Sequence, residues 1–314
     1  VRQMGIEILR KNPGPAAETV CLPLVEHENP RVRAAALEAI NPRAAGVRLF
    51  DAVIPRIDDD DPEVRLSSAR TLARLLSATK VNGDNTRLEK VAQRRIADLI
   101  VPRIAGDDPP TVQAEFLTIL DRLDHDESVN QRTAKLAELL NSEATEAIIA
   151  GIEAVGSMGD TSHNNRMLEL VSNPHPAVRE AVAANLSDYT CEGVFESVIG
   201  LLSDPDPDVV AKAIEGLKDC AQQNQRSAMV AMLNKRPLNE WVGLMAVLTE
   251  SEERATMTQV IDACKIRLTQ ANRYLVATAI LRDLDVAGEL ELLIDQLKGQ
   301  NRIVQDGVIR LFGY

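Results

Sequence analysis

The sequence predicts an all-α protein, a right-handed solenoid of about nine to ten stacked helical hairpins. A short phrase returns about every 31 residues, and an apolar spacing of helical type follows each copy. Aromatic residues make up only 3% of the chain, and no run alternates as a strand would. A period of this length is typical of proteins in which each unit buries its apolar face only against its neighbours.

The repeated phrase is a polar residue, then Pro, and two residues later Val, usually followed by Arg. Clear copies occupy 29–33, 61–65 and 175–179, and weaker ones occupy 110–113 and 206–210. An Asp, Asn or His side chain before the Pro can accept hydrogen bonds from the first free N–H groups of a helix. Pro is favoured at the first helical position. Each copy therefore predicts the start of a helix.

The residues after each phrase keep one helical face apolar. Counted from the Val as zero, positions 4, 5 and 8 are small or apolar, which is helical spacing. These helices, the second of each unit, are predicted to begin near 1, 32, 64, 112, 147, 178, 209, 240, 273 and 303. The first helices of the units are predicted over 16–27, 47–57, 88–104, 130–140, 164–171, 194–202, 226–233, 256–268 and 289–297.

Two helices per unit, with Asp61-Pro62-Glu63-Val64-Arg65 opening the second, resemble the HEAT repeat family in its short bacterial form, the type found in phycobilisome lyases. The resemblance covers essentially the whole chain. It implies an α-solenoid whose second helices line a concave binding face. Members of this family serve as scaffolds, adaptors and regulatory modules, and some are lyases or DNA-repair domains, so the resemblance specifies the fold more sharply than the function.

We expect one continuous array over 1–314, with a polar loop inserted at 79–87. The loop and a longer first helix after it account for one long step of 48 residues between units. The chain opens on Val1-Arg2, which corresponds to the middle of the phrase. We therefore expect these residues to be a fragment of a longer protein.

Charge and hydropathy narrow the range of partners. The chain carries 35 Lys and Arg against 47 Asp and Glu, a net charge of −12. Binding to a phosphate backbone draws on Lys and Arg, which argues against nucleic acid as the main partner. A protein, or an adjacent domain of the parent chain, is expected instead. No run of eighteen apolar residues is present, so we expect no membrane insertion and a cytoplasmic location, free or on a membrane protein.

The sequence contains no pattern that predicts catalysis. The four cysteines are far apart, which favours buried thiols in a reducing compartment. The four histidines lack the spacing of metal ligands. Glycine-rich phosphate loops and nucleophile motifs are absent as well. We therefore predict no catalytic residue, no metal site and no cofactor.

Three arginines, Arg33, Arg65 and Arg179, occupy the last position of the phrase. Because that position repeats with the architecture, we expect them to pair with aspartates of adjacent turns and to form a structural ladder. The alternative is an anion or phosphoprotein site near the N-terminal end, where arginines are frequent over 31–74.

Two sets of residues are candidates for partner binding. Position six of the second helices is often acidic, and a ridge of such residues is predicted to select a basic segment: Glu7, Glu38, Glu153 and Glu215. The C-terminal second helices are apolar around much of their circumference, and aromatic residues there are typical of interface anchors. This stripe comprises Trp241, Val242, Tyr274 and Leu275. The alternatives are a solvated helix face for the ridge and burial within the fold for the stripe.

The function predicted from these features is that of a non-catalytic protein–protein interaction scaffold or regulatory module of a larger bacterial protein. The family resemblance leaves two alternatives open. One is a HEAT-type lyase or chaperone that acts on a pigment protein. The other is the soluble domain of a multidomain, transporter-like membrane protein. No residue-level motif for bilin handling is present, so the first alternative depends on likeness of fold alone.

Overall fold

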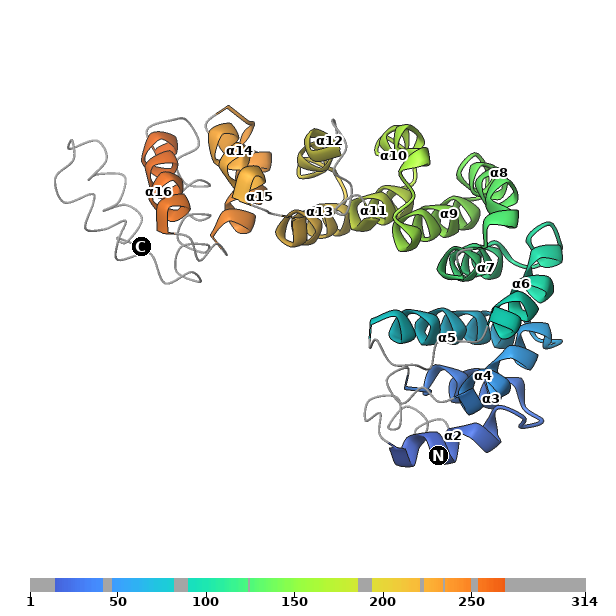
Figure 1. Cartoon of the computed structure of the whole chain (residues 1–314). Coiled ribbons are helices and arrows are strands. Elements are labelled where there is room, and N and C mark those ends of the chain that lie inside the picture. The colour runs from blue at the N-terminus through green and yellow to red at the C-terminus, as the bar shows by residue number, and fades with distance from the viewer. Residues whose placement is uncertain are drawn as a thin grey trace. The chain divides into compact units, whose positions relative to one another are not determined.

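In the described part of the chain every regular element is a helix (Figure 1). The structure is a computed structural model that describes residues 15–41, 47–81, 90–123, 125–185, 194–220, 223–233, 235–249 and 254–268. The helices predicted near 1, 273 and 303 and over 289–297 lie outside these residues.

The first helices of the units carry even numbers, and their bounds lie within about three residues of those predicted at nearly every end. They are α2 (Pro15–Leu24), α4 (Val47–Val53) with the 3-10 turn η2 (Ile54–Asp58), α6 (Lys90–Ile104), η3 (Asp126–Ser128) with α8 (Val129–Leu140), η4 (Thr161–His163) with α10 (Asn164–Leu170), α12 (Val194–Leu201), α14 (Gln223–Leu233) and α16 (Arg254–Leu268).

The second helices carry odd numbers, and most of them begin at the Pro of the repeated phrase. They are α3 (Pro30–Glu38), α5 (Pro62–Val81), α7 (Pro110–Arg122), α9 (Thr145–Met158), α11 (Pro176–Asn185), α13 (Pro207–Cys220) and α15 (Leu238–Leu248). Helix α5 includes residues 79–81, and the rest of the loop predicted over 79–87 lies outside the described residues.

The helices pack as stacked hairpins. Each even-numbered helix from α2 to α14 contacts the odd-numbered helix that follows it. The odd-numbered helices also contact one another in sequence, α3 with α5, α5 with α7 and α7 with α9, and again α11 with α13 and α13 with α15 (Figure 1). The protein is thus an all-α solenoid, as the repeat period predicted.

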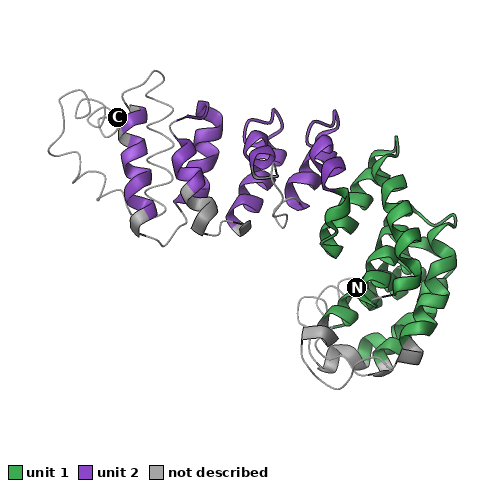
Figure 2. Cartoon of the chain, turned by 45° about the horizontal axis from the view of Figure 1, so that its top comes forward, with its two compact units in different colours: residues 1–163 green, residues 164–314 purple. Residues whose placement is uncertain are grey.

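The chain divides into two compact units, residues 1–163 and residues 164–314 (Figure 2). Unit 1 contains α2 to α9, and unit 2 contains α10 to α16. The single continuous array expected over 1–314 remains a prediction, and each unit is described by itself below.

The buried residues occupy the helical face that the sequence pattern identified. The Val at position zero is fully buried in α5, α11 and α13 and nearly so in α3 and α7. Position eight is buried at Ile40, Leu72, Leu120, Val155 and Leu217. Small and aliphatic side chains at these positions let adjacent helices approach closely, which suits a thin layered core.

Polar side chains cap the helices at the repeated phrase. The Asn29 side chain accepts a hydrogen bond from the Arg31 N–H at 3.0 Å. The Asp61 carboxylate accepts one from the Glu63 N–H at 2.9 Å, and Asp206 does the same for Asp208. These bonds satisfy donors that have no partner inside the helix, which explains why the phrase marks each start.

The arginine of the phrase connects two consecutive hairpins. Arg179 donates Nε and Nη2 to the two carboxylate oxygens of Asp204, at 2.7 and 2.8 Å. Its Nη1 donates to the carbonyl of Asn173 in its own turn at 2.8 Å. Arg33 repeats this arrangement in unit 1, with Asp59 at 2.9 and 2.6 Å. A planar guanidinium fork matches a carboxylate in this way, whereas a lysine ammonium does not.

Arg65 makes the corresponding contacts one hairpin further on. Its Nε donates to Asp108 Oδ1 at 2.6 Å, and its Nη1 donates to the Asp59 carbonyl at 2.8 Å. The other oxygen of Asp108 accepts from Arg103 Nε at 3.0 Å. The Asp108 side chain is only 5% exposed, so both of its charge-assisted bonds are shielded from water. Arg33 and Arg65 are thus engaged by aspartates, as expected of a structural ladder, and the anion site near the N-terminal end would depend on the other arginines of 31–74.

We expect Arg179→Ala to lower the free energy of unfolding by about 3 kcal/mol, because Asp204 would remain buried without its partner. Urea unfolding followed by circular dichroism measures this change. Lys212→Ala serves as the control, since its ion pair with Glu215 of the same helix is largely exposed and contributes little. Equal effects of the two substitutions would contradict a structural role for Arg179.

Acidification should weaken the same contacts. The hydrogen bond from Arg179 lowers the pKa of Asp204 below its ordinary value of 3.8. Burial alone would raise the pKa of Asp59, but hydrogen bonds from Arg33 and from the backbone lower it. A carboxyl with a lowered pKa stabilises the fold fully above its ordinary pKa and loses that contribution as the pH falls through the lowered value. We therefore expect stability to drop below about pH 4, less steeply in Asp204→Asn, in urea titrations at several pH values. Identical slopes for the two proteins would contradict this account.

Candidate functional site

Six charged side chains on α3, α5, α7 and α9 of unit 1 form what we term the charged face. They are Glu38, Arg70, Arg74, Glu115, Arg122 and Glu153. The four helices contact one another in sequence, so residues as far apart as 38 and 153 share one layer. Glu115 interacts electrostatically with Arg70, Arg74, Arg122 and Glu153, which places it at the centre of the set.

Glu115 is held partly out of water. Its side chain is 25% exposed, and Arg70 Nε donates to Glu115 Oε1 at 3.2 Å. Burial raises the pKa of Glu115, while Arg70 and Arg122 act to lower it and the neighbouring carboxylate of Glu153 raises it further. The face is therefore a layer of incompletely solvated charges, in which an approaching charged group would interact more strongly than in open water.

Three members of the charged face form no ion pair within the described part of the chain: Arg74, Arg122 and Glu153. Arg74 donates Nη2 to the carbonyl of Glu38 at 3.2 Å and to the Thr71 hydroxyl at 2.9 Å. Burial lowers the pKa of Arg122, although Glu115 and Asp121 act to raise it. These charges are available to groups outside the chain.

The acidic ridge remains a prediction, and its described members lie in different surroundings. Glu38 accepts a hydrogen bond from the Ser67 hydroxyl at 3.3 Å, and Arg74 lies beside it. Glu153 is exposed on α9. In unit 2, Glu215 forms an ion pair with Lys212 of its own helix at 2.7 Å. Glu7 lies outside the described residues. Arginines stand among the acids of unit 1, so the face carries both signs.

Trp241 lies in the core of unit 2 and not on an exposed stripe. Its side chain is fully buried, and its indole Nε1 has no hydrogen-bond partner among the described residues. Val242 beside it is half-buried, while Tyr274 and Leu275 lie outside the described residues. Gly243 allows the close approach of α15, because a Cβ there would lie 2.8 Å from Leu202 Cδ2. The apolar surface of α15 at Trp241 therefore packs within the protein's own core and is not exposed to a partner.

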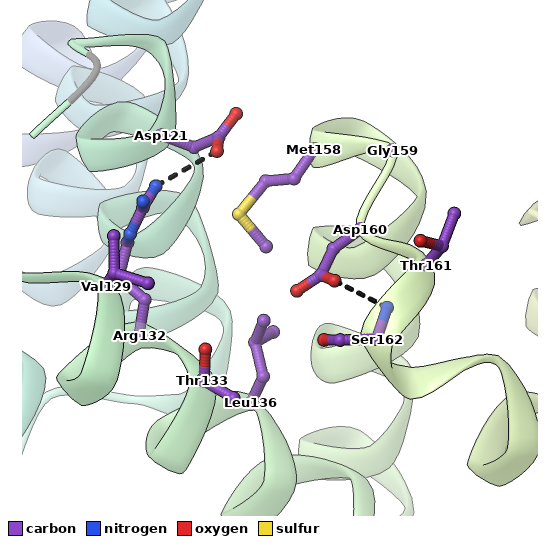
Figure 3. A pocket seen from close by; sticks show the side chains of 10 residues that line it. All are labelled: Asp121, Val129, Arg132, Thr133, Leu136, Met158, Gly159, Asp160, Thr161 and Ser162. Atoms are coloured by element: carbon purple, nitrogen blue, oxygen red, sulfur yellow. Dashed lines mark hydrogen bonds and ion pairs between the residues drawn. The ribbon is translucent and has the colours of Figure 1, made fainter. Parts of the chain in front are cut away.

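A cleft of about 430 Å³ opens in unit 1 where α7 ends, α8 begins and α9 turns into η4 (Figure 3). Its lining combines charged, hydroxyl and apolar side chains. The lining residues are Asp121, Val129, Arg132, Thr133, Leu136, Met158, Gly159, Asp160, Thr161 and Ser162. Gly159 ends α9 with a φ of +65°, a backbone conformation that residues other than glycine rarely adopt. The turn at Gly159 forms one rim of the cleft.

Polar groups of the cleft are arranged by specific bonds (Figure 3). Arg132 Nη1 donates to Asp121 Oδ1 at 3.0 Å, whereas its buried Nε has no partner in the part of the chain that the structure describes. The Ser162 N–H donates to Asp160 Oδ1 at 2.8 Å. Burial alone would raise the pKa of Asp160, but hydrogen bonds from the hydroxyl and N–H of Ser162, together with His163, lower it. Asp160 therefore stays ionised at neutral pH.

The described ranges contain neither a cluster of metal-ligating side chains nor a membrane-spanning helix. Within the described ranges, no group of three or more His, Cys, Asp or Glu is arranged to hold a metal ion. Cys21 and Cys264 are buried, and no disulfide joins them. No helix of that part of the chain has the length and hydropathy needed to cross a bilayer.

Residues 133–218 match the family model for HEAT repeats, which confirms the predicted repeat type in this part of the chain. The matched segment includes α9, α11 and most of α13. No curated protein matches the sequence.

Several solved structures resemble the chain in fold at low identity. YibA of E. coli is 15% identical with a TM-score of 0.49, over 94% of this chain and 96% of that one. An engineered protein is 18% identical with a TM-score of 0.38, over 99% and 94%. The CpcE–CpcF complex of phycocyanin lyase from Nostoc sp. PCC7120 is 16% identical with a TM-score of 0.47, over 80% and 96%. At these values the likenesses carry no functional inference.

Sequence reasoning did not single out Glu115, Arg122 or the cleft. Arg74 and Arg122 both occupy position ten of the frame, two residues beyond the last apolar position. Extending the frame to that position would have identified the pair. The cleft offered a weaker signal, a glycine at the predicted end of a helix followed by Asp160.

We expect Trp241→Ala to lower the free energy of unfolding by about 3–5 kcal/mol, as truncation of a buried aromatic does. Urea unfolding measures the change, and light scattering should give an unaltered solution mass. Val242→Ala, at a half-buried neighbour, provides a matched control with a smaller loss. A Trp241→Ala protein of normal stability that no longer associates would restore the interface hypothesis.

Proposed function

We propose that this chain is a non-catalytic protein-binding module, a scaffold or regulatory part of a larger cytoplasmic protein, that binds a partner segment along the charged face. The observation that supports this most directly is that Arg74, Arg122 and Glu153 form no ion pair in the described part of the chain, although they surround the half-buried Glu115. The HEAT-type repeats are compatible with such a role, since solenoids present extended surfaces for binding.

The charges of the face indicate the chemistry of the partner. A partner acid opposite Arg74 or Arg122, and a partner base opposite Glu153, would complete pairs that the chain leaves open. Complementary charges increase association rates and exclude wrong partners. Arginine is also enriched in protein interfaces because its fork binds carboxylates in two-pronged geometry. A segment with both signs therefore fits this face better than a uniformly basic one.

The test is affinity capture with the purified chain as bait in an extract of the source cells, followed by mass spectrometry and titration of the captured protein. We expect the double substitution Arg74→Glu/Arg122→Glu to weaken binding at least about tenfold, because two attractive contacts become repulsive. Binding should also weaken as salt rises, since these charges are only partly buried.

A matched control is available on the opposite layer. Arg94 and Arg95 are exposed on α6, and Arg94→Glu/Arg95→Glu changes the net charge by the same amount. This control should retain the partner. Equal losses in both double variants would show that net charge and not the charged face governs capture, and absence of any partner would overturn the proposal.

A further inference from the structure

We propose that the cleft in Figure 3 binds the side chain of a lysine in a partner protein, with the ammonium group at Asp160 and the aliphatic stem against Leu136 and Met158. This inference rests on the proposed function, because it supplies an anchor for a bound segment. It adds a defined pocket and a defined residue type to that function.

The charge of the cleft favours a cation. Two carboxylates, Asp121 and Asp160, line it against one guanidinium, Arg132. Arg132 is paired with Asp121, so no Lys or Arg of the lining pairs with Asp160, whose Oδ2 lies 3.4 Å from Nδ1 of the neighbouring His163. The Asp160 side chain is 26% exposed, so one carboxylate can meet an entering group. Figure 3 shows this carboxylate directed into the space between the two walls.

The apolar part of the cleft suits an alkyl stem. Val129, Leu136 and Met158 contribute aliphatic surface, and Figure 3 shows Leu136 and Met158 extending toward Asp160. Lysine combines four methylene groups with a compact charged head, so it can bury its stem while the ammonium reaches a polar end. Methionine adapts its shape to such a stem at little cost.

Hydroxyl groups complete the coordination that an ammonium requires. A lysine ammonium has three N–H donors, and a single carboxylate rarely accepts all of them. Thr133 and Thr161 stand on opposite walls of the cleft and offer further oxygen acceptors. An alkyl chain that ended in a carboxylate would instead face the negative charge of Asp160.

The position of the cleft favours a lysine that is part of a polypeptide over a free amine. The cleft adjoins the charged face in the chain, because Asp121 of the cleft precedes Arg122 of the face. One extended segment can therefore use both.

The test is a titration of the chain, ¹³C-labelled at its methionine methyl groups, with N-acetyl-lysine methylamide. The Met158 signal, assigned with Met158→Leu, should shift with a Kd on the order of 1 mM, as expected for a ligand of this size. Asp160→Asn should weaken binding at least about tenfold, since the amide keeps the acceptor for the Ser162 N–H but removes the charge. Glu143→Gln, in the exposed turn before α9, should bind as the wild type does.

Two further probes on the unaltered chain keep the test independent of any folding defect. N-acetyl-norleucine methylamide has a similar stem without the charge, and n-butylamine has the charge without the amides. Both should bind at least several-fold more weakly. Equal binding of the norleucine probe would overturn the role of the charge, and equal binding of butylamine would indicate a site for free amines. No shift with the lysine probe would overturn the inference altogether.

The titration uses no partner protein, so its outcome is separable from the capture experiment. A partner captured through the charged face without binding of the lysine probe would overturn only the assignment of the cleft. Binding of the probe with no partner in any extract would overturn the proposed function and leave the cleft as a lysine site.

Discussion

The structure depends on one contact that recurs between hairpins, the arginine of the repeated phrase bonded to an aspartate of the next inter-helix turn. At Arg33 and Arg179 the guanidinium binds the carbonyls of its own turn and both carboxylate oxygens of the next. A hairpin cannot bury its apolar face alone, so its position relative to its neighbour must be specified. Apolar packing supplies the attraction, and the planar fork supplies the register, because a shift of one hairpin would separate several bonds at once.

The charged face is a product of that register. Arg70 and Glu115 are 45 residues apart in the chain, yet they lie within 3.2 Å because α5 and α7 are aligned. Similarly, the cleft exists because α7, α8 and the end of α9 converge at one edge of unit 1. Neither feature includes an arginine or aspartate of the phrase contacts, although pairs of the charged face, such as Arg70 with Glu115, also connect neighbouring hairpins. The charges that form no ion pair within the described residues are therefore distinct from the Arg–Asp contacts.

The features that repeat were predictable from the sequence, and those that occur once were not. The Pro of the phrase and the apolar spacing placed most helices because the same physical requirement recurs in every unit. Glu115 is a residue of one repeat only, and the cleft requires the left-handed turn at Gly159. A feature that occurs in a single repeat leaves no periodic signal in the sequence. Trp241 shows a different limit. An apolar helix surface predicts a neighbour, but the pattern does not distinguish the protein's own core from a partner.

Within unit 1, the Arg–Asp contacts of the phrase end at α7, and in unit 2 the same position of α13 carries Val210. The position that carries Arg in α3, α5 and α11 carries Gln113 in α7, and its amide donates to the carbonyl of Gly106 in its own turn at 2.8 Å. In α9 the same position is Ile148, which makes no such bond. A stack of repeats under tension yields where the coupling between neighbours is weakest. Within unit 1, apolar packing holds α7 against α9 without an Arg–Asp contact of the phrase, so a pulling force or a bending partner would change the helix spacing there more easily than between α3 and α5 or α5 and α7.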